Sequence, residues 1–102
     1  ARYASARAPF AAKTLFFVCV LMQRSLWETV GPLDEQFGLG NCEDKDYCLR
    51  VQAAGLPLTV DPGVFVAHKG HATFGRLPEG MFNALLLTNE RKLGEKYPKG
   101  VN

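Results

Sequence analysis

Blocks of apolar residues, separated by short polar or glycine-containing stretches, divide this chain into predicted elements. Residues 15–22 form a continuous apolar run of aromatic and β-branched side chains, which is typical of a strand buried on both faces. Residues 25–30 follow as a short predicted helix, in which Ser25 is the expected N-cap and Glu28 completes a capping box. A Gly-Pro pair then ends this helix.

A second helix is predicted over residues 43–54, after a loop over residues 34–40. Asn41 is a suitable N-cap for this helix, and Gly55 is a natural residue to end it. The apolar positions of the segment recur at helical spacing, so one face is expected to point into the core. That inward stripe consists of Tyr47, Cys48, Val51 and Ala54.

Two short strands and a final helix complete the predicted order. Strands are expected at residues 56–60 and 64–67, separated by an Asp-Pro-Gly turn. Residues 70–76 are polar and contain glycine, which indicates a flexible loop, and a helix with proline near its start covers residues 78–96. Its apolar face contains Phe82, Leu85, Leu86 and Leu93. The order strand, helix, helix, strand, strand, helix indicates an α/β piece.

Composition adds bounds to this pattern. The 102 residues are enough for one domain, with 47% hydrophobic and 22% charged residues, an ordinary globular balance. The net charge of +2 gives no support for nucleic acid as a partner. We divide the chain into a loose basic arm (residues 1–14), a domain (residues 15–97) and a tail (residues 98–102). The arm is interpreted as solvated, although its arginines would also suit phosphates or anionic lipid.

Cysteine usage and hydropathy predict a cytoplasmic protein. The longest apolar run has eight residues, whereas a membrane-spanning helix needs about 20, and no signal peptide is visible. The three cysteines include no Cys-x-x-Cys pair, so reduced thiols are the simplest interpretation. A zinc site built from Cys42, Cys48 and the histidines lacks the usual ligand spacing. Peripheral contact with the inner face of a membrane stays compatible with these features.

The segment Gly-Leu-Gly-Asn-Cys-Glu-Asp-Lys-Asp-Tyr-Cys-Leu-Arg, residues 38–50, carries the most chemistry. It places Glu43 and Asp44 side by side where a glycine-rich loop turns into the second predicted helix. Asp46 and Arg50 are four residues apart and are expected to pair outside the inward stripe. Adjacent acids here suit a catalytic base with its support, but acids also collect in the first turn of helices because of the helix dipole.

The residues around this segment distinguish between these two interpretations. Residues 24–37 read Arg-Ser-Leu-Trp-Glu-Thr-Val-Gly-Pro-Leu-Asp-Glu-Gln-Phe, residues 64–70 read Val-Phe-Val-Ala-His-Lys-Gly, and a Thr-Phe pair follows. In this order and spacing, the series resembles the C-terminal half of the family 2 glycosyltransferases, over about residues 15–97. The resemblance implies the C-terminal portion of a GT-A fold, an α/β structure of mixed short strands with about three helices.

The resemblance also implies an activity, the inverting transfer of a sugar from a nucleotide sugar to an acceptor hydroxyl. Asp44 matches the residue that acts as the general base in the family, and Glu43 would bind the acceptor or orient the loop. The residues placed on the acceptor side are Trp27, Asp34, Glu35 and Asn41. A core role on the short helix is the alternative for Trp27.

On the donor side, the resemblance implies a divalent metal, Mn²⁺ or Mg²⁺, in the complete enzyme and none in this fragment. His68 matches a histidine that completes the metal coordination in many GT-A enzymes, with a hydrogen-bonded strand-end histidine as the alternative. His71, Lys69 and Arg76 would contact the donor diphosphate, with side chains of a solvated loop as the alternative. The string Asp44-Lys-Asp46 lies within the Glu-Asp motif, so we do not assign it as the family's Asp-x-Asp metal motif.

No other Asp-x-Asp and no phosphate-cradling glycine loop occurs in these residues. The chain is therefore expected to carry the acceptor-side half, to be inactive alone, and to form a homo-oligomer through strand edges that lack partners. The expected partners of the complete enzyme are a nucleotide-sugar donor and a saccharide or other hydroxyl acceptor. A non-catalytic interaction or dimerisation module derived from the same fold is the alternative function.

Overall fold

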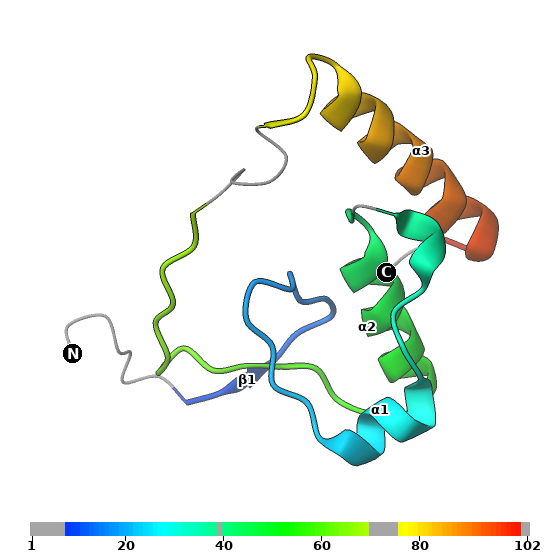
Figure 1. The fold of residues 1–102 in the computed structure, drawn as a ribbon. Helices are drawn as coiled ribbons and strands as arrows, with labels where there is room; N and C mark the ends of the chain where they lie inside the picture. The colour runs from blue at the N-terminus through cyan, green and yellow to red at the C-terminus, as the bar shows by residue number, and fades with distance from the viewer. Residues whose placement is uncertain (1–7, 39, 70–75, 101–102) are drawn as a thin grey trace.

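The computed structural model describes residues 8–38, 40–69 and 76–100, and it shows a small mixed α/β arrangement (Figure 1). The elements in chain order are β1 (Phe10–Ala11), α1 (Arg24–Val30), the 3₁₀ helix η1 (Glu35–Phe37), α2 (Glu43–Ala53), β2 (Thr59–Val60) and α3 (Met81–Lys96). In the described ranges, three α-helices accompany one two-stranded antiparallel sheet. The predicted α/β class is confirmed at this level, and its assignment to the GT-A fold stays a prediction.

The sheet is formed by part of the arm that was predicted to be loose. Phe10 lies opposite Val60 and Ala11 opposite Thr59, and the next residue, Ala12, donates its N–H to the carbonyl of Leu58 at 2.9 Å. The end of the arm is therefore attached to the chain that follows α2. This part of the expectation for residues 1–14 is wrong, because the backbone groups of Phe10–Ala12 find partners in a segment almost fifty residues away.

Helix α1 confirms the short helix predicted over residues 25–30, but not its capping box. The helix begins one residue earlier, with Gln23 as the N-cap and no side-chain cap bond. Ser25 thus lies inside the first turn, where its hydroxyl donates to Gln23 Oε1 at 3.5 Å. At the other end, Gly31 has a φ of 92° and donates its N–H to the Trp27 carbonyl, so the predicted stop is confirmed.

Helix α2 ends as its sequence predicts. Gly55 has a φ of 78° and donates its N–H to the Gln52 carbonyl at 2.9 Å. The following Leu56 N–H reaches back to the Val51 carbonyl at 3.2 Å. These two bonds form a Schellman motif, which requires a left-handed residue and so favours glycine.

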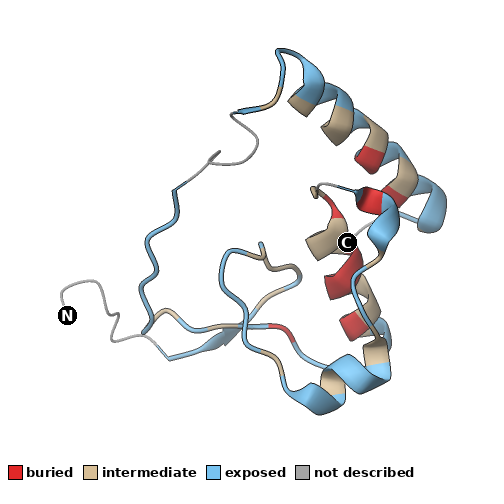
Figure 2. Ribbon diagram, viewed as in Figure 1, coloured by how far each residue is buried: buried red, intermediate tan, exposed pale blue. Residues whose placement is uncertain are grey.

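The inward stripe of α2 forms the first of two hydrophobic clusters. Tyr47, Cys48 and Val51 are buried with Leu58, whereas Ala54 is exposed because it lies just past the last helical residue. Partly buried side chains from the preceding loop and α1 complete the cluster: Leu15, Phe17, Met22, Leu26 and Val30. Figure 2 shows that burial is concentrated on α2 and the parts of the chain against it.

The strand predicted over residues 15–22 does not form. The segment has no regular structure and turns near its middle, where the Val18 N–H donates to the Phe16 carbonyl at 2.8 Å. The strands found within the described ranges, β1 and β2, pair only with each other. A strand needs a neighbour for its backbone groups, so the apolar run packs only some of its side chains and exposes others, with Phe16 at 73% and Leu21 at 99%.

The region after α2 is also less regular than predicted. Of the strand expected at residues 56–60, only Thr59–Val60 pairs, and residues 64–67 form no strand. The turn between them is confirmed, because the Gly63 N–H donates to Asp61 Oδ1 at 2.9 Å and the Val64 N–H donates to the Asp61 carbonyl. The loop predicted over residues 70–76 lies, apart from its last residue, outside the described residues.

Helix α3 confirms the predicted final helix and builds the second cluster. The Met81 N–H donates to the carbonyl of Pro78 at 3.0 Å, just before the helix. Leu93, in the C-terminal half of α3, is buried together with Phe37 and Cys42, and Tyr97 packs against them. Helix α3 thereby lies across η1 and the start of α2 (Figure 1). The rest of its predicted apolar face, Phe82, Leu85 and Leu86, is only partly buried.

Candidate functional site

The predicted site lies at a sharp corner of the backbone before α2. Asn41 and Cys42 are consecutive non-glycine residues in the left-handed region, with φ values of 68° and 70°. Cys42, and not the predicted Asn41, is the N-cap residue, and its side chain makes no cap bond. Its carbonyl accepts the Asp46 N–H at 2.9 Å and so closes the first turn of the helix. The corner fixes the direction in which Glu43 and Asp44 leave the backbone.

Asp44, the predicted base, lies in the first turn of α2 and is partly buried. Its Oδ1 accepts a hydrogen bond from the Lys45 N–H at 2.8 Å, and its Oδ2 accepts one from the Phe17 N–H at 3.3 Å. A carboxylate has about four lone-pair sites, so these two bonds leave capacity for a further donor. The negative charge is also favoured by the helix N-terminus. Asp44 is therefore oriented by two main-chain groups without being saturated.

Glu43 is the neighbouring carboxylate, and it has fewer hydrogen-bond partners than Asp44 among the described residues. Its Oε2 is buried and has no hydrogen-bond partner among the described residues. Burial raises the pKa of Glu43, and the Asp44 charge adds to this rise, against a hydrogen bond from its own backbone N–H. Two adjacent carboxylates in unlike environments are a pattern typical of acid–base sites.

Asp34 and Glu35, two residues predicted to lie on the acceptor side, are the N-cap and the first residue of η1. Asp34 caps this 3₁₀ helix, because its Oδ1 accepts the Gln36 N–H at 3.1 Å. Its Oδ2 accepts bonds from Gln36 Nε2 at 2.7 Å and from Lys96 Nζ at 2.9 Å. Hydrogen bonds from Lys96, and then from Gln36, hold the pKa of Asp34 well below its usual range. Asp34 thus has a clear structural role, whereas Glu35 is exposed.

A buried ionic cluster links α2 to α3 next to this corner. Asp46 pairs with Arg50 as predicted, with 3.1 Å between Asp46 Oδ2 and Arg50 Nε, but it is fully buried, so the expectation that the pair lies outside the core is wrong. Its Oδ1 accepts bonds from the Tyr97 hydroxyl at 2.5 Å and from Lys96 Nζ at 2.7 Å. A buried carboxylate needs such partners, because an unpaired charge is costly to bury.

The pKa values of two partners of Asp46, Lys96 and Tyr97, are shifted in this environment. Burial works against the charge of Lys96, yet its hydrogen bonds to Asp46 and Asp34 raise the pKa of the ammonium group overall. Burial, followed by the hydrogen bond to Asp46, raises the pKa of Tyr97 well above its usual value. Lys96 therefore stays a cation and Tyr97 a hydrogen-bond donor at neutral pH, and together they join α3 to both η1 and α2.

Asn89, which sequence reasoning missed, is the most completely buried polar side chain of α3, with no exposed surface. Its Nδ2 lies within hydrogen-bonding distance of the Phe37, Gly40 and Asn41 carbonyls, all in the loop that leads to the corner. A signal was present in the sequence. Residue 89 continues the apolar spacing of Phe82, Leu85, Leu86 and Leu93, so an amide there indicates a polar group inside the core.

Trp27, the remaining acceptor-side candidate, projects from α1. Its ring stacks on that of Tyr47 with centroids 6.4 Å apart and an interplanar angle of 26°, and 42% of the residue is exposed. Tyr47 lies one turn after Glu43 and donates its hydroxyl to the Gly31 carbonyl at 2.9 Å. The indole therefore packs against Tyr47 and is partly open to solvent, an arrangement compatible with sugar stacking. Its acceptor role stays a prediction.

The described residues among those predicted for the donor side are not brought to the corner. His68, Lys69 and Arg76 are exposed, and His71 lies outside the described residues. Figure 1 shows the segment that ends at residue 69 well separated from the start of α2. Over residues 8–38, 40–69 and 76–100, no three histidine, cysteine, aspartate or glutamate side chains are grouped to hold a metal ion.

The two buried cysteines belong to separate hydrophobic clusters. Cys42 packs with Phe37 and Leu93, whereas Cys48 belongs to the cluster around Tyr47, and Cys19 is exposed. Burial raises the pKa of the Cys42 thiol, with the positive charge of Lys45 opposing this effect. The two buried cysteines are therefore core residues and do not form a shared ligand pair.

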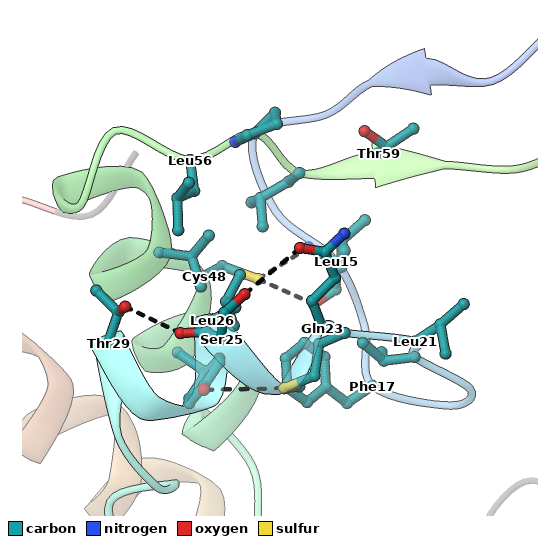
Figure 3. A pocket seen from close by; sticks show the side chains of 16 residues that line it. Leu15, Phe17, Leu21, Gln23, Ser25, Leu26, Thr29, Cys48, Leu56 and Thr59 are labelled. Carbon is teal, nitrogen blue, oxygen red and sulfur yellow. Dashed lines mark hydrogen bonds between the residues drawn. The ribbon is translucent and has the colours of Figure 1, made fainter.

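A cavity of about 460 Å³ has neither Glu43 nor Asp44 in its lining, although Phe17, whose N–H donates to Asp44, forms part of its wall. It is bounded by the loop before α1, by α1 itself, by the second half of α2 and by the chain leading to β2 (Figure 3). Its lining is largely apolar and includes Leu15, Leu26, Val51 and Leu58, with the Cys48 Sγ hydrogen-bonded to the backbone of Leu15. None of the predicted site residues lines it.

None of the helices that the structure describes is both long and apolar enough to cross a bilayer. Comparison with protein-family models, with curated proteins and with solved structures gives no match to this chain. The geometry at the start of α2 is thus the main structural guide to function.

Proposed function

We propose that this chain is the acceptor-side part of an inverting glycosyltransferase similar to family 2, with Asp44 as the general base. The observation that carries the proposal is the position of Asp44 in the first turn of α2. Two main-chain N–H groups orient its carboxylate, and hydrogen-bonding capacity remains for an acceptor hydroxyl. The linked motifs from Arg24 to Lys69 add to this argument.

The chemistry assigned to Asp44 is proton transfer. The acceptor hydroxyl gives its proton to the carboxylate while its oxygen forms a bond to the anomeric carbon of the donor sugar. The bond from that carbon to the nucleoside diphosphate breaks on the opposite face, which inverts the configuration and releases the diphosphate as an anion. Glu43 is assigned the role that the family resemblance implies, binding the acceptor or orienting the loop.

A metal is not assigned a step. The family resemblance implies Mn²⁺ or Mg²⁺ at the donor diphosphate, and His68 is the one candidate ligand in this chain. The described residues hold no group of ligands around it, and its segment lies apart from Asp44. These residues alone therefore do not fit a metal site, and donor binding requires groups beyond them.

An interaction module is the second candidate function, because two apolar segments are exposed. Phe16 and Leu21 lie on the loop before α1, and Val64 and Phe65 are 63% and 58% exposed after β2. Apolar surface of this kind marks sites of association. A module without catalysis would use these segments and would have no need of Asp44.

The test is a kinetic comparison in the complete protein, with the upstream coding sequence first read for a nucleotide-binding part that contains Asp-x-Asp. Transfer from UDP-, GDP- and dTDP-sugars is assayed with Mn²⁺ for the unchanged protein and for Asp44→Asn. The variant keeps the shape of the side chain and removes the proton acceptor, so kcat should fall by roughly 10²–10⁴-fold, with the donor Kd little changed.

Three further variants sharpen this test. Glu43→Gln should lower kcat less than Asp44→Asn, since it supports binding, and His68→Ala should weaken Mn²⁺ dependence and donor affinity together. Asp61→Asn is the matched control, because Asp61 is an exposed turn residue whose side chain accepts the Gly63 N–H, far in the sequence from the start of α2. If Asp44→Asn leaves kcat within about threefold of the unchanged enzyme, a loss under 1 kcal/mol, the base assignment is wrong.

A further inference from the structure

The corner before α2 is a conformation that its own residues do not favour. Asn41 and Cys42 have φ values of 68° and 70°, and the left-handed region costs an L-residue roughly 1–2 kcal/mol, somewhat less for asparagine. Strained residues persist only where their surroundings hold them. No side-chain cap bond forms at the start of α2, but a side chain from another element contacts the corner.

That element is the second half of α3. Asn89 places its amide nitrogen against the carbonyls of Phe37, Gly40 and Asn41, across 48 to 52 positions of sequence. One turn later Leu93 packs on Phe37 and Cys42. Asn89 and Leu93 therefore stabilise the loop in different ways. Asn89 donates to its carbonyls, and Leu93 covers its apolar side chains.

We propose that Asn89 is a positioning residue, which fixes the backbone of the Asn41–Cys42 corner and through it the direction of Glu43 and Asp44. The catalytic part of this inference rests on the proposed function. The positioning itself does not, because it concerns the conformation of the corner alone.

The amide is suited to this role for a specific reason. Three carbonyls converge on Asn89 Nδ2, and an NH₂ group is a double donor that presents no negative charge to them. Aspartate has nearly the same shape but would turn an acceptor toward the same carbonyls. Asn89→Asp is therefore a change of hydrogen-bonding chemistry with little change of volume, and Asn89→Ala removes the group altogether.

The first experiment measures amide hydrogen exchange in the full chain. The Gly40 N–H bonds to the Phe37 carbonyl and the Asp46 N–H to the Cys42 carbonyl, so both report on the corner. Asn89→Asp and Asn89→Ala should each accelerate exchange at these two amides at least tenfold, relative to amides of α1. Asn83→Asp, at an exposed position of the same helix, is the matched control and should change neither.

Two results would overturn the proposal. One is unchanged exchange at Gly40 and Asp46 in both Asn89 variants. The other is equal acceleration of all amides, including those of α1, which would show that Asn89 stabilises the whole fold without acting on the corner in particular. If Asn89→Asp does not fold, Asn89→Ala carries the comparison.

The second experiment is kinetic and uses the complete transferase. Asn89→Ala should lower kcat at least tenfold and leave the donor Kd within about twofold, because the donor does not depend on the corner. A kcat unchanged in a variant whose corner exchanges faster would contradict the link to catalysis. Absence of transfer in the unchanged protein would contradict the proposed function, and the exchange measurement would still decide the positioning.

Discussion

At the scale of single residues, the features that hold this molecule together are buried polar groups with distant partners. The pair of Asp46 and Arg50 was predictable, because i,i+4 spacing on a helix is a local property. The burial of Asp46 was not, since it depends on Tyr97 and Lys96, about fifty residues away. Asn89 could have been identified as a core residue from its helical register, but not the carbonyls it contacts.

Loss of the Asp46 carboxylate should destabilise the chain strongly. Asp46→Ala leaves Lys96 without one of its two acceptors and the Tyr97 hydroxyl without its carboxylate, and breaking a buried ion pair costs about 3–5 kcal/mol. Urea unfolding at neutral pH measures the change. Glu35→Ala, at an exposed position of η1, should stay within about 0.5 kcal/mol. A loss of similar size in both variants would show that the Asp46 cluster is not a stabilising centre.

Glu43 should lower stability at neutral pH, as expected of a residue kept for function. Its pKa is raised in the folded state, so stability falls as pH rises from the unfolded pKa through the folded pKa. Glu43→Gln removes this charge and should stabilise the chain at pH 7, because a neutral amide costs less to bury than a carboxylate.

The pH dependence of this effect provides its control. At about pH 4, below the ordinary glutamate pKa of about 4.3, Glu43 is largely protonated and therefore neutral. The difference in the free energy of unfolding between the unchanged chain and Glu43→Gln should then become smaller. Urea unfolding of the two proteins at both pH values measures it. A Glu43→Gln variant that is less stable at pH 7, or equally stabilised at both pH values, would argue against burial of a charged Glu43.

At the scale of elements, local signals predicted the helices and turns, and failed for the strands. The glycine after α2, the turn at Asp61 and the span of α3 all follow from nearby residues. The run over residues 15–22 has strong strand character, but a strand forms only beside a partner, and the sequence pattern does not supply one. Part of the arm pairs with β2 for the same non-local reason.

Two glycines with equal space around them should respond oppositely to alanine. Gly55 and Gly94 both have open space where a Cβ would be added, but only Gly55 has a positive φ, 78°. Gly55→Ala should destabilise by about 1 kcal/mol, because the Schellman motif holds that residue left-handed. Gly94→Ala, inside α3, should stabilise by about 0.5–1 kcal/mol.

Thermal unfolding separates these two effects. For a domain of this size, 1 kcal/mol corresponds to a shift in Tm of about 4–8 °C, so the two variants should lie on opposite sides of the unchanged chain. Shifts in the same direction would mean that side-chain volume, and not backbone conformation, decides the outcome at these positions.

At the scale of the whole molecule, the chain is more open than its length requires. Its radius of gyration is 15.4 Å, whereas a compact domain of about 100 residues has about 13 Å. The core is divided into two clusters, one around Tyr47 and one around Phe37. Among the large apolar side chains of the described residues, Leu21 and Phe16 have the highest exposed fractions, and both lie on the run that was predicted to be a buried strand. The sequence pattern thus predicts that residues 15–22 are buried, whereas the contacts within the described chain leave several of these side chains exposed.

We therefore expect the isolated chain to self-associate through the segment of residues 15–22. Leu21 is 99% exposed, so Leu21→Lys removes apolar surface from the segment without disturbing the core. Leu87→Lys makes the same change on α3, where the side chain is 67% exposed.

Sedimentation equilibrium at micromolar concentration should give a species larger than the 11.2 kDa monomer, with at least tenfold weaker association for Leu21→Lys and little change for Leu87→Lys. Equal weakening by both substitutions would indicate non-specific association, and an unchanged chain that sediments only as a monomer would show that this surface does not pair with itself.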